Sequence, residues 1–115
     1  RSGVKSSRID VVWVPGAVEI PIALLWMTRK RRYSALVALG AVIRGETPHF
    51  EYVASIASHG VLEVSLRSGI PIAFGVLTTE NRKQAMARSG GRDNRGREAA
   101  RVALEMASLS RRLRR

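Results

Sequence analysis

The sequence predicts an α/β sandwich built around a parallel sheet. Two stretches, residues 35–43 (ALVALGAVI) and 70–77 (IPIAFGVL), are almost wholly apolar, as expected of strands covered on both faces. Helical stretches separate and follow them, and strands that alternate with helices are typical of parallel sheets. The 115 residues suit one domain, and neither an internal repeat nor a linker divides the chain.

The first half of the chain is expected to contain a strand, a helix and a second strand. Ile9–Val14 is a short, mostly β-branched run, typical of a strand. Glu19–Arg32 is expected to be a helix with Pro21 in its first turn, where the missing N–H of proline costs little. Its apolar stretch gives way to the basic run 29–32, a charge arrangement typical of a helix C-terminus. The strand Ala35–Ile43 follows.

The second half is expected to contain helices around the strand Ile70–Leu77. One helix runs from Phe50 to Leu66 and is ended by Gly69, and another begins at Thr78 and reaches Arg88. A Gly-rich basic loop, Ser89–Gly96, leads to the last helix. Apolar residues recur at helical spacing in the first helix at Val53, Ala57, Val61 and Val64, and in the last at Ala99, Val102, Met106, Leu109 and Leu113.

The composition excludes several classes of protein. There is no cysteine, which rules out disulfides and thiolate metal sites. No apolar run reaches the roughly 18 residues needed to span a bilayer, and no signal peptide is visible. A cytoplasmic protein is therefore expected. Because the first residue is Arg1 rather than Met, we also expect a fragment, a processed product or an incomplete version of a longer protein.

The charge is strongly basic and unevenly spread. The net charge is +11, from 20 Lys and Arg against 9 Asp and Glu, and the chain ends in Arg111-Arg112-Leu113-Arg114-Arg115. Such an end is suited to a polyanion, for example a nucleic acid. It is equally typical of a solvated helix end, where cations oppose the negative end of the helix dipole, and we favour this second interpretation.

Residues with catalytic potential follow the ends of the expected strands. In parallel sheets, ligands bind beyond the carboxyl ends of the strands. Three such ends are residues 14–19 (VPGAVE), 43–49 (IRGETPH) and 74–79 (FGVLTT). His49 follows a buried strand, and its ordinary pKa of about 6.5 would allow proton transfer near neutrality, although a capping or surface histidine would look the same. His59, in mid-helix, is expected to be structural or exposed.

Two further groups of residues suit an anionic ligand. Glu46 and Thr47 precede a helix whose first N–H groups favour phosphate, although threonine often serves for capping alone. Arg88, Arg92 and Arg95 flank the Gly-rich loop, and a guanidinium group suits phosphate, although a solvated basic face has the same pattern. No metal-ligand spacing, Ser-His-Asp pattern, dinucleotide fingerprint or P-loop is present.

Four segments carry longer motifs. Residues 14–21 read VPGAVEIP, residues 40–53 read GAVIRGETPHFEYV, residues 74–81 read FGVLTTEN and residues 105–107 read EMA. In order and spacing they resemble the VPGAFEIP, GxVIRGxTPHFDYV, FGVLTTEN and EMAN segments of the 6,7-dimethyl-8-ribityllumazine synthase family, also called the riboflavin synthase beta chain family. The resemblance extends from about Ile9 to the end. Four segments in register are far more specific than one short motif.

The resemblance implies a fold, a reaction and an assembly. The fold is a flavodoxin-like three-layer sandwich with a parallel sheet. The reaction condenses 5-amino-6-(D-ribitylamino)uracil with 3,4-dihydroxy-2-butanone 4-phosphate to 6,7-dimethyl-8-ribityllumazine in riboflavin biosynthesis, with no cofactor and no metal. The assembly is a homo-oligomer, a pentamer or a multiple of it up to an icosahedral capsid. Its active sites lie at subunit interfaces, and riboflavin synthase is a candidate partner.

The resemblance also assigns roles to residues of this chain. His49 would transfer protons. Glu46, Thr47 and Arg88 would hold the phosphate, and Arg95 stands in the place of a family lysine. The pyrimidine and ribityl site would be lined by Ala17, Val18, Glu19, Ala41, Val42 and Ile43, with Phe74 contributed from a neighbouring subunit.

The chain departs from the family in three places. Val18 stands where the family often has Phe. The loop 93–96 is one residue shorter than other forms, and Arg95 keeps the charge of lysine but not its shape. The family's first strand, ending in an aromatic-Asn pair whose ring stacks on the pyrimidine, and the helix after it have no counterpart here. That strand lies between Ile9–Val14 and Ala35–Ile43. These two segments are therefore expected not to pair, unless another segment or chain supplies the strand or the fold is altered.

Three functions therefore stand against one another: a lumazine synthase, a non-catalytic assembly or binding protein on the same scaffold, and a basic nucleic-acid-binding module. The presence of His49, Thr47 and Arg88 favours the first over the second. The third explains the arginine-rich end but not the strand-end motifs, and the aromatic residues that stack on bases make up only 5% of the chain.

Overall fold

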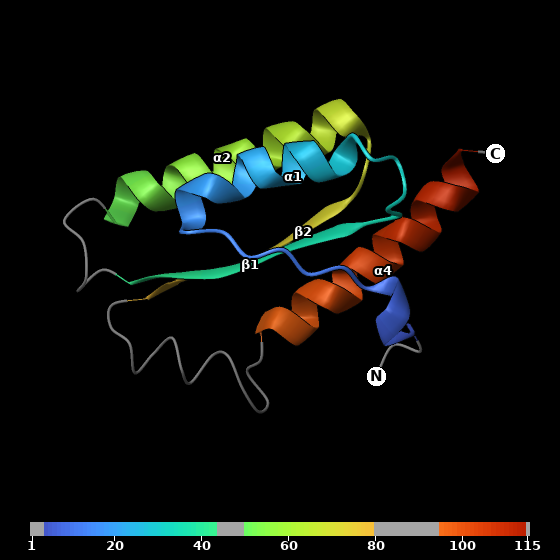
Figure 1. Ribbon diagram of the computed structural model, residues 1–115, viewed down its shortest axis with the longest axis horizontal. Helices are drawn as coiled ribbons and strands as arrows, with labels where there is room; N and C mark the ends of the chain where they lie inside the picture. Colours follow the sequence, from blue (N-terminus) through green and yellow to red (C-terminus); the bar gives the residue numbers. More distant parts are fainter. Residues whose placement is uncertain (1–3, 44–49, 80–94, 115) are drawn as a thin grey trace.

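Three layers build the fold in the computed structural model, which describes residues 4–43, 50–79 and 95–114. Figure 1 shows two helices on one face of the sheet and a third on the other, which confirms the predicted α/β sandwich. In chain order the elements are the 3-10 helices η1 (Ser6–Arg8) and η2 (Ala17–Glu19), then α1 (Ile20–Thr28), β1 (Leu36–Ile43), α2 (Phe50–Ser68), β2 (Ile72–Thr79) and α4 (Arg95–Leu113).

The strands β1 and β2 pair in parallel. Leu36 lies opposite Ile72 at the start of the pair, and Ile43 lies opposite Thr79 at its end. Just before β2, the carbonyl of Pro71 accepts a hydrogen bond of 2.9 Å from the N–H of Leu36, which extends the pairing by one residue. Both strands therefore start together and stop together, so that each end of the sheet is a common edge.

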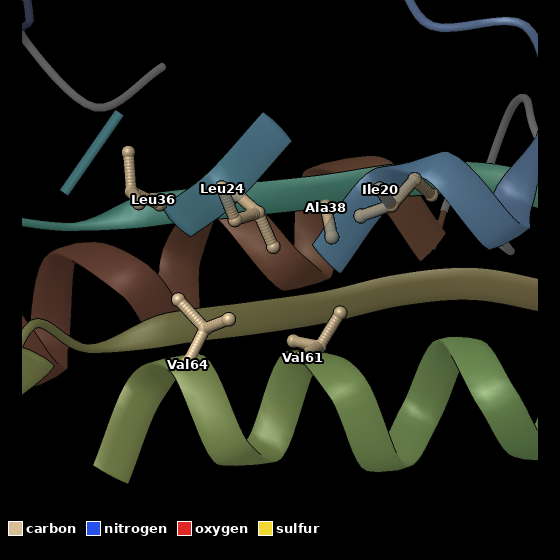
Figure 2. Packing of buried hydrophobic residues seen from close by; sticks show 6 residues of the cluster. All are labelled: Ile20, Leu24, Leu36, Ala38, Val61 and Val64. Atoms are coloured by element: carbon tan, nitrogen blue, oxygen red, sulfur yellow. The ribbon is translucent and has the colours of Figure 1, made fainter. Parts of the chain in front are cut away.

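The larger core lies between the sheet and the layer formed by α1 and α2. On α2, Val61 and Val64 are buried with Ala57, and Val53 is half-buried, which confirms the predicted apolar stripe. Burying an aliphatic side chain of this size contributes roughly 1.5–3 kcal/mol, so this face holds the two helices on the sheet. The buried members of this core, drawn in Figure 2, are Ile20, Leu24, Leu36, Ala38, Val61 and Val64.

The opposite core, under α4, is made largely of alanine. Ala99 and Ala103 pack on Ala73 of β2. A Cβ added to Gly75 would lie only 3.1 Å from the Cβ of Ala99, so the helix runs very close to the strand. This close approach is available only to small side chains.

The predicted apolar stripe of the last helix is therefore partly wrong. Ala99 is buried as predicted, but Ala103 and Ala107 complete the buried face, whereas Val102 and Met106 are exposed. Helical spacing alone favours the larger apolar residues for the buried face, whereas the close approach of helix and sheet leaves room only for the smallest side chains. Leu109 is half-buried, and Leu113 is exposed near the end of the helix.

The helix α1 ends at Thr28 and not at Arg32 as predicted. The Thr28 Oγ1 donates to the carbonyl of Leu25 at 2.7 Å, and the N–H of Arg29 donates to the same carbonyl at 3.3 Å. Arg31 then adopts a φ of 54°, in the left-handed region, which an α-helix of L-residues cannot use. The basic run consequently lies in a turn after the helix and not in its last turn.

The predicted strand Ile9–Val14 is wrong as a paired element. Ile9 is extended, with φ −115° and ψ 118°, but the sheet of the described residues contains only β1 and β2. The segment runs in the same direction as β1, from a hydrogen bond between Asp10 and Tyr33 near the start of β1 to η2 (Figure 1). That it does not pair with β1 agrees with the expectation that another strand belongs between them.

One smaller expectation changes, and two lie wholly or largely outside the described residues. Thr78 and Thr79 belong to β2 and do not start a helix, because they continue the pairing with the last residues of β1. The rest of the helix predicted up to Arg88 lies outside the described residues, as does most of the basic loop, whose Arg95 and Gly96 open α4.

The strand β1 is covered fully on one face only. Leu39 is 56% exposed, because α4 lies mainly over β2. Of the helices in the described ranges, none is both long and apolar enough to cross a bilayer.

Candidate functional site

The carboxyl ends of β1 and β2 form one edge of the sheet, with Ile43 level with Thr79. Figure 1 shows that α1 and α2 begin at this edge and run back along the sheet. The first residue of α1, Ile20, reaches over β1, where its Cδ1 would lie 3.7 Å from a Cβ added to Gly40. Strand ends and helix starts therefore meet here, which is where ligands bind in parallel α/β proteins.

The short helix η2 brings the first predicted group of residues to this edge. It directly precedes α1 and contacts both β1 and α2. The N–H of Glu19 donates to the carbonyl of Gly16 at 3.1 Å, and the Oε1 of Glu19 folds back to 3.2 Å from the place of a Cβ on Gly16. Ala17 packs on the core, whereas Val18 is 41% exposed. Val18 and the half-buried Glu19 are therefore the parts of η2 open to a ligand.

The last residues of β1 differ in how far their side chains are open to a ligand. The side chain of Ala41 is exposed, but that of Val42 is buried in the core. Val42 can therefore meet a ligand only through its backbone, a distinction that the sequence motif does not reveal. Ile43, the last residue of the strand, lies at the edge itself.

Phe74 is not brought together with this group within one chain. It lies opposite Ala38, three residues before the level of Ala41, which is about 10 Å back along the strand. Its side chain is 42% exposed. Within a single chain Phe74 therefore stays apart from the edge.

Arg95 opens α4 on the side of the molecule where the strands end. It precedes Ala99, which packs beside Gly75, by four residues, or about 6 Å along the helix. The start of α4 therefore points toward the same edge as the starts of α1 and α2.

The remaining predicted residues, Glu46, Thr47, His49 and Arg88, lie outside the described residues together with Arg92. In the sequence, residues 44–49 join the end of β1 to the start of α2, and both of these ends lie at the edge. His59 is exposed on α2, as expected, with its Nδ1 3.2 Å from the Ser55 Oγ. In the part of the chain that the structure describes, no group of three or more His, Asp or Glu is placed to hold a metal ion.

A polar cluster of Asp10, Arg32 and Tyr33, which the sequence did not predict, lies at the opposite edge of the sheet. The Asp10 Oδ2 accepts hydrogen bonds from the Tyr33 hydroxyl at 2.6 Å and from the Arg32 Nη2 at 2.9 Å. The hydrogen bond from Tyr33 lowers the pKa of Asp10, with a further contribution from Arg32, and the same bond raises the pKa of Tyr33. Arg32 and Tyr33 are 22 and 23 residues from Asp10 in the sequence, so no local sequence pattern predicts the cluster.

These features define a class of protein: a parallel α/β sandwich with a candidate small-molecule site at the carboxyl ends of its strands. Comparison with known proteins gives the family. The profile of the 6,7-dimethyl-8-ribityllumazine synthase family matches residues 1–111. The chain therefore belongs to the 6,7-dimethyl-8-ribityllumazine synthase family, whose members are enzymes of riboflavin biosynthesis.

Individual relatives agree with the family match. The chain is 52% identical to the 6,7-dimethyl-8-ribityllumazine synthase of Clostridium kluyveri over 114 residues, covering 98% of the chain and 74% of the relative. It is 51% identical to that of Synechococcus elongatus over 110 residues, covering 96% and 61%. It is 48% identical to that of Thermosynechococcus vestitus over 103 residues, covering 90% and 58%. The chain thus spans less than two thirds of the length of the last two relatives.

Proposed function

We propose that this chain, assembled with copies of itself, condenses 5-amino-6-(D-ribitylamino)uracil with 3,4-dihydroxy-2-butanone 4-phosphate and releases phosphate and water. The observation that carries the proposal is the single edge at which η2, the ends of β1 and β2, and the start of α2 meet. The family's motif residues stand at these points in the sequence. The product is 6,7-dimethyl-8-ribityllumazine, and the matched relatives are named as synthases of this compound.

In this proposal the phosphate and the proton transfers belong to the segments that follow the strands. Glu46 and Thr47 lie just before α2, where the free N–H groups of a helix start favour an anion. Arg88 would supply a guanidinium fork and Arg95 a second positive charge. His49 would take and return protons, for which an imidazole is suited near neutral pH.

The pyrimidine and its ribityl chain would lie against η2 and the end of β1. Val18 and Glu19 offer partly open side chains, and Ala41 offers an exposed methyl group beside the backbone of Val42 and Ile43. Ala17 would shape η2 from the core side. Phe74 would come from a neighbouring subunit, which is consistent with its exposure at a distance from the edge.

A homo-oligomer is supported by large apolar side chains that one chain leaves uncovered. Trp13 is 90% exposed and Leu66 is 75% exposed, and Trp26 and Tyr52 are exposed as well. Large apolar side chains left this exposed would be covered at an interface between subunits. We propose a pentamer or a multiple of it, with the active site between subunits, riboflavin synthase as a candidate partner and a cytoplasmic location.

The test is an absorbance assay of lumazine formation from the two substrates in the presence of a chelator. It is run on this chain and on the same chain joined to the family's N-terminal strand and helix, each checked for assembly. We expect turnover by the joined protein at least. An assembled joined protein that does not turn over would refute the proposal.

A second candidate function is a non-catalytic assembly protein on the same scaffold. The observation in its favour is that residues 9–14 lie beside β1 without pairing, where the family has a strand that carries a substrate contact. It predicts that both proteins assemble and that neither forms the lumazine, so the same assay separates the two functions.

A further inference from the structure

The end of the molecule opposite the candidate site collects positive charge from two distant parts of the sequence. The first part is the turn after α1, with Arg29, Lys30, Arg31 and Arg32, all exposed. The second is the end of α4, with Arg111, Arg112 and Arg114, also exposed. We call these seven residues the basic end.

Packing shows that these two parts lie at the same edge of the sheet. On α4, Ala99 lies beside Gly75, and Ala103 belongs to the cluster that contains Ala73 and Ala35. The helix therefore runs against the strand direction, and its last two turns pass the beginning of β1. Figure 1 agrees, since the turn between α1 and β1 and the end of α4 lie at the same end of the molecule.

Acidic groups offset little of this charge. Asp10 is bound to Arg32 at 2.9 Å, and Glu105, earlier on α4, is bound to Arg101 at 3.8 Å. Within the described ranges, none of the other six cations of the basic end has a carboxylate within ion-pair distance. Lys5, the N-cap residue of η1, and Arg8, its last residue, add two more exposed cations in the segment before Asp10.

Helix capping explains only part of this arrangement. A cation in the last turn of a helix typically contributes about 0.3–1 kcal/mol, and Arg111 and Arg112 are placed for it. The last turn of α1, in contrast, contains no basic residue, and backbone N–H groups already bind the carbonyls of Leu25, Met27 and Thr28. The cations after α1 are therefore not needed to close that helix.

We propose that the basic end is a second binding site, which holds the sugar-phosphate backbone of a nucleic acid. Six of its seven cations are arginines, whose planar fork binds phosphate oxygens in pairs. Two separate groups of cations suit the closely spaced phosphates of a duplex, which carries one charge per about 1.7 Å of its axis. This binding would not depend on the enzyme site, which lies at the other edge of the sheet.

Charge, rather than base recognition, would govern this site. Tyr33, the aromatic residue beside Arg32, already has its hydroxyl bound to Asp10 and its ring 5.5 Å from the Arg32 guanidinium carbon. Base stacking needs exposed rings. The binding is therefore indifferent to sequence and falls steeply with salt. An anionic membrane is less suited, because Leu113 is the one large apolar side chain within the two basic stretches.

The test measures anisotropy of a labelled duplex of about 20 base pairs, roughly 70 Å long at 3.4 Å per pair, across a salt series. RNA and DNA duplexes of arbitrary sequence are used, with vesicles of phosphatidylserine and phosphatidylcholine as a separate arm. Arg111→Gln/Arg112→Gln is compared with Arg97→Gln/Arg101→Gln, which removes the same charge from the first half of α4. Arg29→Gln/Lys30→Gln tests the other part of the basic end, the turn after α1.

We expect Arg111→Gln/Arg112→Gln to weaken duplex binding and to lower the slope of log K against log salt by about 0.9 for each phosphate that the variant no longer neutralises. Arg29→Gln/Lys30→Gln should do the same, and Arg97→Gln/Arg101→Gln should change the slope much less. Circular dichroism and native mass show that each variant is folded and assembled.

Three outcomes overturn the proposal: no duplex binding, equal weakening in the control variant, or binding to the anionic vesicles alone. Lumazine formation by Arg111→Gln/Arg112→Gln is measured in parallel. Because the two activities are assayed separately, a failure of the proposed enzyme function and a failure of the basic end are distinguishable.

Discussion

The two edges of the sheet share one frame but expose different chemistry. At the carboxyl edge, β1 and β2 stop in register and α1 and α2 begin, so the edge gathers helix starts, which favour anionic groups. At the amino edge, α1, α2 and α4 end, and the exposed residues there are mostly cations. A parallel α/β topology therefore sorts residues by the order of the elements. Whatever follows a strand lies at one edge, and whatever follows a helix lies at the other.

The largest effect is expected from the carboxyl edge, at His49. His49→Ala should lower the rate constant at saturating substrate by about 10²- to 10⁴-fold, because a positioned acid-base group typically contributes this much. Native mass should be unchanged. His59→Ala is the matched control, since His59 is exposed on α2, where its Nδ1 lies 3.2 Å from the Ser55 Oγ. An unchanged rate constant in His49→Ala would remove this residue from the mechanism.

The next effect separates a specific phosphate contact from general charge. Arg88→Ala should raise the Michaelis constant of the butanone phosphate by about ten- to a hundredfold, because a hydrogen bond to a charged group is worth roughly 1.5–3 kcal/mol. The constant for the pyrimidine should change much less. Arg88→Lys should recover only part, since lysine lacks the two-pronged geometry.

The amino edge provides the control for Arg88. Replacing Arg114 and Arg115 removes two charges but should barely alter either Michaelis constant at moderate salt, where distant exposed charges are screened. Steady-state kinetics on both variants decide the matter. Equal effects would mean that the general basic field holds the phosphate and that the two edges are not separate.

A third prediction concerns the packing that supports the carboxyl edge. A Cβ on Gly60 of α2 would lie 2.5 Å from the Cγ and 2.7 Å from the Cβ of Pro21, in the first turn of α1. Overpacking costs about 1–3 kcal/mol, which exceeds the gain of roughly 1 kcal/mol in helix propensity, because the proline ring cannot turn aside. Gly60→Ala should therefore lower the free energy of unfolding in urea.

Gly40→Ala is the control for this packing prediction. A Cβ there would meet its nearest neighbour, the Ile20 Cδ1, at an ordinary 3.7 Å, so the change in stability should be small. If both variants unfold at the same urea concentration, α1 and α2 are not in the close contact that supports η2.

The smallest effect is expected from the Asp10 cluster at the amino edge. Because the pKa of Asp10 is lowered, its contribution to stability is present above the ordinary value of 3.8 and is lost as the pH falls through the lowered folded value. Because the pKa of Tyr33 is raised, its contribution is present below about pH 10 and is lost as the pH rises through the raised value. Asp10 is exposed and Tyr33 is only half-buried, so screening by solvent keeps the effect small.

Melting temperatures measured from acid to alkaline pH test this prediction. Asp10→Asn should flatten the profile at both ends, and Tyr33→Phe should reproduce most of the change, because the hydrogen bond between the two is the first cause of both shifts. A profile that is unchanged in both variants would show that the cluster does not hold residues 9–14 beside β1.

Strong local patterns predicted most of the fold and the outline of the site. The apolar runs became β1 and β2, and the stripe at Ala57, Val61 and Val64 became the buried face of α2. The order of the elements then predicted that residues 14–19 would meet the ends of the two buried strands at one edge, although these residues form η2 and do not follow a paired strand. The buried side chain of Val42 was not predictable, because a motif records which residues are present but not which way they face.

The sequence by itself determined the family, the alternation of strands and helices, and the place of the candidate residues at the strand ends. These depend on residue type and on spacing along the chain, which are local properties. Only the tertiary structure decided that α4 buries its alanines and leaves Val102 and Met106 exposed. It also decided that the turn after α1 and the end of α4 share one edge. Both outcomes depend on contacts between residues far apart in the sequence, which no local pattern contains.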